Sequence, residues 1–265
     1  MKQWKLENAP IVYYISGTAH KQWVVFLHAA FVDHNMFRQQ VAYFQDQYNE
    51  LTLDIIGHGQ STDTKRGDSI TKMPVWIHEI LKKEQIDRAH IVGISLGAIL
   101  AQKFADQFPK TVQSLACFGG YDIHHFQGEM QQKNQAAHGL MVLKAAFSIK
   151  WFAESNKKIS AYTPQAQKEF YEMNLRFPKR SFRYFAVRDT GGDAPQTGPR
   201  GYPMLIGCGQ RDTPMELQAV ARWKEREPEC KVRIFPGAGH CVNMDVPQAF
   251  HHALEAFWTG GDETT

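Results

Sequence analysis

The chain has 265 residues, of which 43% are hydrophobic, so it is long enough to bury a full core in one large domain. Its 30 basic and 27 acidic residues leave a net charge of +3, too small to indicate nucleic acid or an anionic membrane as a partner. Residues 1–10 lack the apolar segment of a signal peptide, and no run approaches the roughly 18 apolar residues of a membrane-spanning helix. We therefore expect a cytoplasmic globular protein, and the sequence leaves open whether it forms a homodimer.

The cysteines fit the same expectation. All four lie in or beside apolar, strand-like runs, without the spacing of metal ligands. They are Cys117, Cys208, Cys230 and Cys241. We interpret them as reduced thiols of the core.

Strand-like and helix-like segments alternate through the first 118 residues. Two short runs between residues 3 and 15, separated by a turn-rich spacer, predict a hairpin. The further predicted strands are 22–27, 49–56, 88–94 and 112–118, and the predicted helices are 34–47, 70–81 and 96–108. Helices of ten or more residues between strands imply crossover connections. This pattern indicates a doubly wound, mostly parallel α/β sheet covered on both faces.

The alternation stops after residue 121 and resumes near residue 200. Between these points the predicted elements are helices only: 128–152, 163–177 and 180–188, followed by a linker at 190–199. The last predicted elements are strands 202–208 and 231–235 and helices 214–227 and 247–258, before a polar tail expected to be disordered. We therefore expect a core of residues 1–121 and 200–265, with residues 122–199 forming a helical lid inserted between two strands.

A candidate nucleophile lies at residues 91–100, where an apolar strand breaks into Gly-Ile-Ser-Leu-Gly and resumes as a helix. A serine on such a turn is held in a strained conformation with its hydroxyl clear of the sheet. That serine is Ser95. A serine hydroxyl needs a base to take its proton, and the base needs a third group to orient it.

Two later loops supply the partner residue types. Asp212 follows the strand at 202–208, and His240 follows the strand at 231–235. Because parallel strands end at the same edge of a sheet, Ser95, Asp212 and His240 are expected to converge there. They form a candidate catalytic triad.

Other interpretations of the acid stay open. Asp212 is also well placed to cap the helix that begins at Pro214. Asp122, after the strand at 112–118, is the alternative acid. Asp245 is interpreted most simply as a helix-start residue.

For the base, His124 and His125 at the start of the helical segment compete with His240. We favour His240 because it follows the last strand. Three further polar residues are interpreted as loop-shaping groups that bind the backbone: His28, Asp54 and His58.

At these residues the chain resembles the α/β-hydrolase family. The Gly-Ile-Ser-Leu-Gly segment resembles the nucleophile elbow, and the order serine, acid, histidine matches that of the family triad. Residues 28–31, His-Ala-Ala-Phe, resemble the family's oxyanion loop, and residues 54–61 resemble its Asp-x-x-Gly-x-Gly-x-Ser loop. The resemblance implies that the backbone N–H groups of Ala30 and Leu96 form an oxyanion hole. Ala29 stands where these enzymes usually have glycine.

The predicted lid is basic and rich in aromatic residues. Residues 140–189 contain ten lysine or arginine residues and four acidic ones. This charge either steers an anionic substrate or lies on solvated helix faces, and we favour the second interpretation. Part of the aromatic surface is expected to line an apolar pocket.

The resemblance implies a cofactor-independent serine hydrolase that acts on a small to medium, partly apolar carboxylic ester. It leaves open a thioesterase, a lactonase, a carbon–carbon bond hydrolase, the lyase of menaquinone synthesis, or a ligand receptor with incidental turnover. We expect neither a metal nor a nucleotide, because the elbow lacks the third glycine of a dinucleotide loop and the lysine of a phosphate loop.

Overall fold

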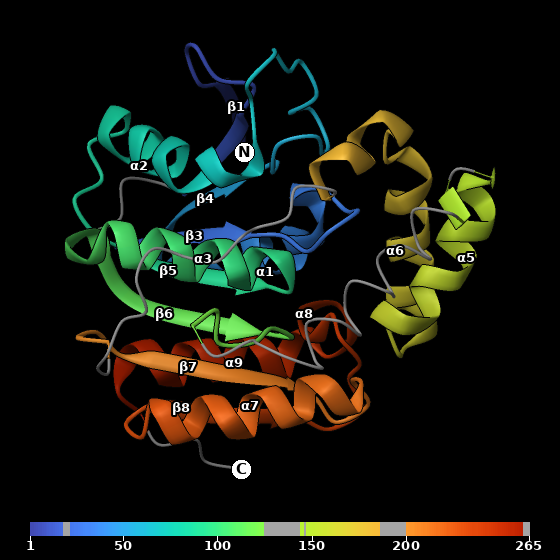
Figure 1. Ribbon diagram of the computed structural model, residues 1–265. Helices are drawn as coiled ribbons and strands as arrows, with labels where there is room; N and C mark the ends of the chain where they lie inside the picture. The colour runs from blue at the N-terminus through green and yellow to red at the C-terminus, as the bar shows by residue number, and fades with distance from the viewer. Residues whose placement is uncertain (18–21, 125–143, 146, 186–199, 262–265) are drawn as a thin grey trace.

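The computed structural model describes residues 1–17, 22–124, 144–145, 147–185 and 200–261, and these residues contain an eight-stranded sheet (Figure 1). The strands lie in the order β1-β2-β4-β3-β5-β6-β7-β8. Their bounds are β1 (Lys2–Lys5), β2 (Val12–Ser16), β3 (Trp23–Leu27), β4 (Asn49–Leu53), β5 (Ala89–Ile94), β6 (Val112–Phe118), β7 (Met204–Gly209) and β8 (Lys231–Phe235). The pairings of β2 with β1 and β4 are antiparallel, whereas the others are parallel. The predicted α/β fold class is therefore confirmed.

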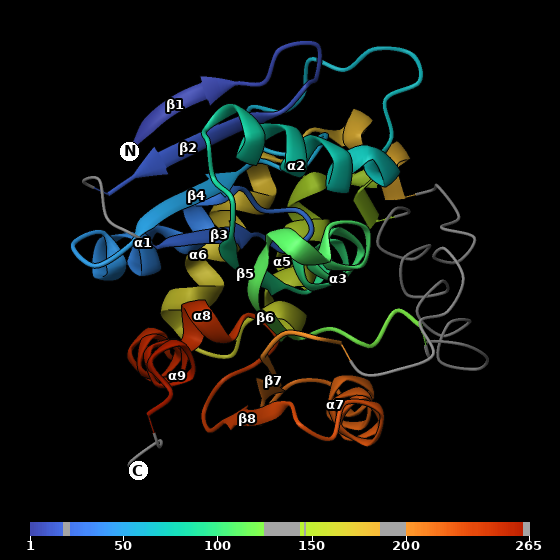
Figure 2. The ribbon, with the colours of Figure 1, turned by 90° about the vertical axis from the view of Figure 1, so that its left-hand side faces the viewer.

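Helices cover both faces of the sheet (Figure 2). One face carries α2 (Met73–Lys83), α3 (Leu96–Gln107) and α7 (Pro214–Arg226), and the other carries α1 (Arg38–Phe44), α8 (Val242–Asp245) and α9 (Pro247–Thr259). Successive residues of β3 show how one strand serves both layers. Val25 packs into the core beneath α2 and α3, whereas Phe26 packs into the core beneath α1 and α9. An uninterrupted apolar run is thus what this position in the sheet requires.

The predicted elements of the core are present with small changes at their ends. The predicted helix at 34–47 begins as a 3-10 turn, η1 (His34–Phe37), whose N-cap Asp33 accepts the backbone N–H of Asn35. The predicted helix at 70–81 likewise begins as η2 (Ile70–Lys72) before α2. One short helix, α8, was not predicted because its four residues are too few to show a period.

The inserted segment, residues 122–199, contains α5 (Ile149–Ser160), α6 (Pro164–Arg176) and η4 (Lys179–Phe185) in its described part. Figure 1 shows α5 and α6 beyond the carboxyl edge of the sheet, toward which β6 and β7 point. The predicted helix at 163–177 is confirmed as α6, with Thr163 as its N-cap. The linker at 190–199 and most of the polar tail lie outside the described residues.

Two predicted helices of this segment differ from the structure. The prediction at 128–152 falls mostly outside the described residues, and α5 continues eight residues past its predicted end. The buried side of those last turns includes Asn156 and Ser160, and the Asn156 amide donates to the Asn174 side chain at 2.7 Å. Hydrophobic periodicity cannot reveal a polar buried face. The predicted helix at 180–188 is instead the 3-10 turn η4 as far as Phe185, and residues 186–188 lie outside the described residues.

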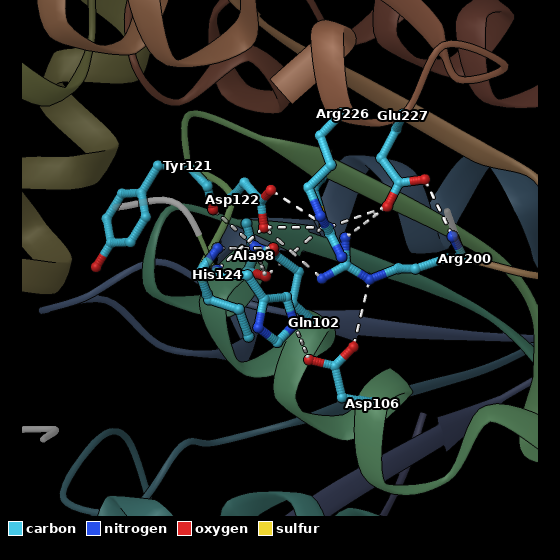
Figure 3. Close-up of polar contacts among 11 residues, drawn as sticks. Ala98, Gln102, Asp106, Tyr121, Asp122, His124, Arg200, Arg226 and Glu227 are labelled. Atoms are coloured by element: carbon cyan, nitrogen blue, oxygen red, sulfur yellow. Dashed lines mark hydrogen bonds and ion pairs between the residues drawn. The ribbon is translucent and has the colours of Figure 1, made fainter. Parts of the chain in front are cut away.

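A buried ion cluster lies where the inserted segment leaves and rejoins the core (Figure 3). Arg200, directly after the segment, has a side chain only 1% exposed. Its guanidinium contacts Asp106 of α3 at 3.3 Å and Glu227, beside the end of α7, at 3.1 Å. Three buried or half-buried charges are thereby held together in a medium that would strongly penalise each one alone.

The start of the inserted segment joins the same cluster. Asp122 contacts the Arg226 guanidinium at 3.2 Å and lies 3.9 Å from Arg200. The His124 Nε2 atom lies 2.7 Å from the Asp106 carboxylate. Both ends of the segment are therefore attached to α3 and α7 through shared carboxylates (Figure 3).

All four cysteines are buried and free, as predicted. Within the described ranges, none of the helices combines the length and apolar composition that a membrane crossing would need.

We predict that Arg200→Met destabilises the protein by about 3–5 kcal/mol, because removing the arginine leaves the carboxylates of Asp106, Asp122 and Glu227 buried without their common partner. Urea unfolding near neutral pH measures the change. The matched control is Arg66→Met, which removes an exposed arginine and should cost less than about 0.5 kcal/mol. Equal effects of the two substitutions would show that the cluster does not stabilise the fold.

Candidate active site

The turn between β5 and α3 carries Ser95 with a positive φ of 55° and a ψ of −115°. A positive φ is costly for a residue other than glycine, and residues held in such strained conformations cluster at functional sites. The turn is held because the Ser95 N–H donates to the Phe118 carbonyl at 2.8 Å. Any Cβ at Gly97 would overlap the Leu27 carbonyl, so only glycine lets α3 approach the end of β3 so closely. The Ser95 side chain lies on this elbow at a half-buried position.

The structure brings Asp212 and His240 together. His240 Nδ1 lies 3.1 Å from each carboxylate oxygen of Asp212. The Asp212 side chain is fully buried, whereas that of His240 is 17% exposed. The two loops are joined because the Arg211 N–H donates to the Ala238 carbonyl at 2.8 Å. This pairing directs Nδ1 to the carboxylate and leaves Nε2 as the nitrogen that can exchange a proton with another group.

A glycine turn after β6 lies between the imidazole and the serine elbow. A Cβ at Gly119 would stand 3.1 Å from Nδ1 and Cε1 of His240, and one at Gly120 would stand 3.8 Å from the Ser95 carbonyl oxygen. Gly119 also has φ 58°, a conformation that favours glycine. The absence of side chains here lets the turn approach both the ring of His240 and the elbow of Ser95.

The surroundings of His240 favour its protonated form. Burial by itself lowers the pKa of this imidazole, but the charge of Asp212, the hydrogen bond to it and the charge of Glu216 raise the pKa to about 9. The carboxylates therefore outweigh desolvation. An imidazolium formed during proton transfer is stabilised in this site.

The two residues of the predicted oxyanion hole lie in adjacent segments. Ala30 follows β3, and Leu96 is the first residue of α3, which Gly97 holds against the end of β3. The left-handed residue of this loop is Phe31, with φ 67°, and not Ala29. Alanine is thus accommodated at position 29 without the conformation that it disfavours. The donor role of Ala30 and Leu96 stays a prediction.

The alternative to Asp212 as the acid and one alternative to His240 as the base make contacts outside this site. Asp122 and His124 belong to the buried ion cluster (Figure 3). His125 lies outside the described residues. Asp54 accepts hydrogen bonds from the backbone N–H groups of His34 and Gln60, as expected of a loop-shaping residue.

Two buried histidines are His28, the first residue of the oxyanion loop, and His58, whose ring lies 5.1 Å from that of His28. The His28 Nε2 accepts the Ile55 N–H at 2.9 Å, which agrees with its predicted role in binding backbone. His58 Nδ1 lies 3.1 Å from the Ile56 carbonyl, and burial and the nearby His28 lower the pKa of His58 to about 3. Burial also lowers the pKa of His28, and we assign both rings to loop structure.

Asp245 has a role that sequence reasoning missed. Its carboxylate accepts the N–H of Gly239 at 2.8 Å, the N–H of Tyr162 at 3.0 Å, and both the N–H and hydroxyl of Thr163 at 2.7 and 2.9 Å. The interpretation as a helix-start residue is wrong, because the N-cap of α9 is Val246 and Asp245 ends α8. Asp245 instead ties the turn between α5 and α6 to the residue before the candidate base. Nothing in its sequence spacing indicates this contact.

A second carboxylate, Glu216, was also missed. One oxygen each from Asp212 and Glu216 and one nitrogen of His240 lie within 4.8 Å of one another. Since Nδ1 of the imidazole is engaged by Asp212, we assign this group to proton chemistry and not to a cation. The signal available in the sequence was the Thr213-x-x-Glu216 pattern of a helix N-terminus.

A family model described as alpha/beta hydrolase fold matches residues 22–247. The chain belongs to the α/β-hydrolase family. Its broad class is therefore that of the α/β hydrolases. This agrees with the resemblance noted at the elbow and with the order of the candidate triad.

Individual relatives are distant but cover most of the chain. The 3-oxoadipate enol-lactonase 2 of Acinetobacter baylyi is 24% identical, over 94% of this chain and 93% of the relative. The (E)-2-((N-methylformamido)methylene)succinate hydrolase of the same organism is 21% identical, over 88% and 89%. A solved thermophilic esterase from Thermogutta terrifontis superposes with a TM-score of 0.81 at 16% identity, covering 94% of this chain and 93% of that one.

We predict that Asp245→Ala lowers the stability of the protein by at least about 2 kcal/mol, because it leaves the N–H groups of Gly239, Tyr162 and Thr163 without their acceptor. Thermal unfolding measures the loss, and Asp46→Ala, at an exposed position, is the matched control. An unchanged thermal midpoint in Asp245→Ala would show that the hydrogen bonds of the Asp245 carboxylate do not stabilise the fold.

Proposed function

We propose that the protein is a serine hydrolase that cleaves a small to medium, partly apolar carboxylic ester through an acyl-enzyme. The observation that carries this proposal is the Asp212–His240 pair, which the Gly119–Gly120 turn connects to the elbow of a serine with a positive φ. A buried carboxylate that orients an imidazole near a strained serine is the arrangement that activates a hydroxyl nucleophile.

In the proposed reaction the Ser95 oxygen attacks the ester carbonyl carbon, and its proton passes to Nε2 of His240. Asp212 stabilises the resulting imidazolium, and the N–H groups of Ala30 and Leu96 bind the oxyanion. Collapse of the tetrahedral intermediate breaks the bond to the alcohol, which takes the proton from His240. Water, deprotonated by the same imidazole, then attacks the acyl-enzyme, releasing the carboxylic acid and restoring the serine. No cofactor is required.

An aromatic cluster next to the oxyanion loop supports an apolar acyl group. The ring of Phe31, directly after Ala30, lies 5.0 to 5.4 Å from the rings of Phe152, Phe177 and Phe182. Those three residues come from the inserted segment, and all four are buried. We infer that this segment acts as a lid and that its phenylalanines face the acyl group.

Basic residues of the same segment make ion pairs at its surface. Lys157 lies 2.8 Å from Glu154, and Arg176 lies 3.5 Å from Asp33. These pairs favour the interpretation of the basic charge as a solvated helix face. We therefore propose an uncharged ester before an anionic one.

A lactone is the second candidate substrate. The relative named an enol-lactonase matches along nearly the whole chain. A lactone is a cyclic ester, so the same attack and proton transfer apply, with the alcohol remaining attached to the acyl group. Parallel assays with open-chain esters and lactones distinguish the two substrates.

We predict that a fluorophosphonate probe adds once to the wild type and does not add to Ser95→Ala, because the probe reacts with an activated serine. Intact-mass analysis measures the adduct. Turnover of p-nitrophenyl esters of about two to twelve acyl carbons, a range that spans typical ligand pockets, should be lost in the same variant.

The control for this experiment is Ser69→Ala, which removes a surface N-cap serine and should keep both the adduct and the turnover. An adduct that persists in Ser95→Ala would place the nucleophile elsewhere. An adduct without multiple turnover of any ester would favour a receptor-like protein.

The pH dependence provides an independent prediction. His240 must be neutral to accept the serine proton, and its pKa is raised to about 9. The value of kcat/KM should therefore rise with pH and reach half of its maximum near pH 9. A profile already flat between about pH 6 and pH 9 would contradict the raised pKa of His240, because the base would then be neutral across that range.

A further inference from the structure

The N-terminus of α7 places a second carboxylate beside the Asp212–His240 pair. Glu216 is the third residue of this helix, and Thr213 is its N-cap. One oxygen of Glu216 lies within 4.8 Å of an oxygen of Asp212 and of a nitrogen of His240. Two carboxylates therefore lie near one imidazole, of which Asp212 makes the direct contact.

The simplest alternative role for Glu216 is structural. A glutamate three residues after a threonine N-cap commonly accepts the backbone N–H of that threonine in a reciprocal pair of bonds. Here the Thr213 N–H donates to Asp212 instead, at 2.7 Å, and the Thr213 hydroxyl donates to the Glu216 carboxylate. Thr213 thus joins the two carboxylates to each other, and the usual reciprocal bond from Glu216 to the threonine N–H is replaced.

The charges agree with this geometry. Burial raises the pKa of Glu216, and the nearby Asp212 raises it further, while His240 and the Thr213 hydroxyl lower it. The charge of Glu216 in turn contributes to the raised pKa of His240, after the larger effect of Asp212. The interaction between Glu216 and His240 is thus mutual, as opposite charges at this separation require.

We propose that Glu216 is a positioning residue of the catalytic site, which acts through His240 by stabilising its imidazolium form together with Asp212. The proposal deepens the proposed function and rests on it, because it assigns a role in the proton transfer. Glu216 does not touch the substrate. It adjusts the pH at which the base becomes available and the stability of the charged state that forms while the serine attacks.

Within the part of the chain that the structure describes, the other groups around the imidazole do not supply this charge. The turn at Gly119 and Gly120 has no side chains, and the Asp245 carboxylate is engaged by backbone N–H groups. Burial raises the pKa of the Cys208 thiol to about 12 and that of the Cys241 thiol well above its usual value, so both are neutral. The nearest basic side chain of the Asp212 loop is Arg211, whose guanidinium lies over the Tyr162 ring.

The test is a titration of His240 by NMR of the full-length protein with isotopically labelled histidine, in which the His240 signal is assigned by its loss in His240→Gln. We expect Glu216→Gln to lower the titration midpoint of His240 by roughly one pH unit, the shift typical of losing one nearby opposite charge. The side-chain oxygen of glutamine can still accept the Thr213 hydroxyl, so the substitution removes charge more than structure.

The matched control is Glu225→Gln, which removes an exposed charge from the same helix and should leave the midpoint unchanged. A midpoint that stays in place in Glu216→Gln, or that moves equally in both variants, overturns the proposal. Circular dichroism and thermal unfolding of each variant identify any loss of structure.

Kinetics then separate this proposal from the proposed function. In Glu216→Gln the half-maximum of kcat/KM should move to lower pH by the same amount as the NMR midpoint, with a smaller maximum. A shifted His240 titration in a protein whose Ser95 takes no fluorophosphonate would support the role of Glu216 on the imidazole and refute the hydrolase mechanism. An unshifted titration in an active hydrolase would refute only the role of Glu216.

Discussion

The hydrogen bond between His240 Nδ1 and Asp212 is the interaction on which the rest of the site depends. It exists because β7 and β8 are parallel neighbours, so the loops after them leave the sheet side by side and join through the Arg211 N–H. The Asp245 carboxylate then fixes Gly239, the residue before the imidazole, against the inserted segment. Of these two supporting contacts, the first joins two backbone groups and the second joins backbone N–H groups to a carboxylate. The position of the imidazole is therefore determined by the sheet and the insertion together.

Much of the core could be predicted because its elements carry local signals. The continuous apolar run of β3 indicates a buried strand, and the glycines around Ser95 indicate a tight strand-to-helix turn. The structure contains both. The features that were missed have no such signal. The polar buried side of α5 is satisfied by an amide on α6, and Asp245 binds backbone more than eighty residues away in the sequence.

The same distinction holds within the site. Asp212 and His240 were predicted from their places after strands, which topology alone brings together. The sequence marks Glu216 only as the second residue of a possible helix-capping pair with Thr213. Its position near the imidazole depends on the Thr213 N–H donating to Asp212 and not to Glu216. The conformation of the loop at Asp212 and Thr213 determines which acceptor this N–H reaches. Only the three-dimensional structure could distinguish a helix-capping glutamate from a second carboxylate near the imidazole of His240.

The buried ion cluster at Arg200 has a consequence for how this architecture varies. Asp122 and Arg200, at the two ends of the inserted segment, lie 3.9 Å apart, so the intervening chain departs from the core and returns to it at one point. The entropy of closing a loop changes only slowly with its length once its ends are fixed. The length of the segment between them can therefore change at little entropic cost while β6 and β7 keep their register, provided that the turn at Tyr162 and Thr163 still reaches the Asp245 carboxylate.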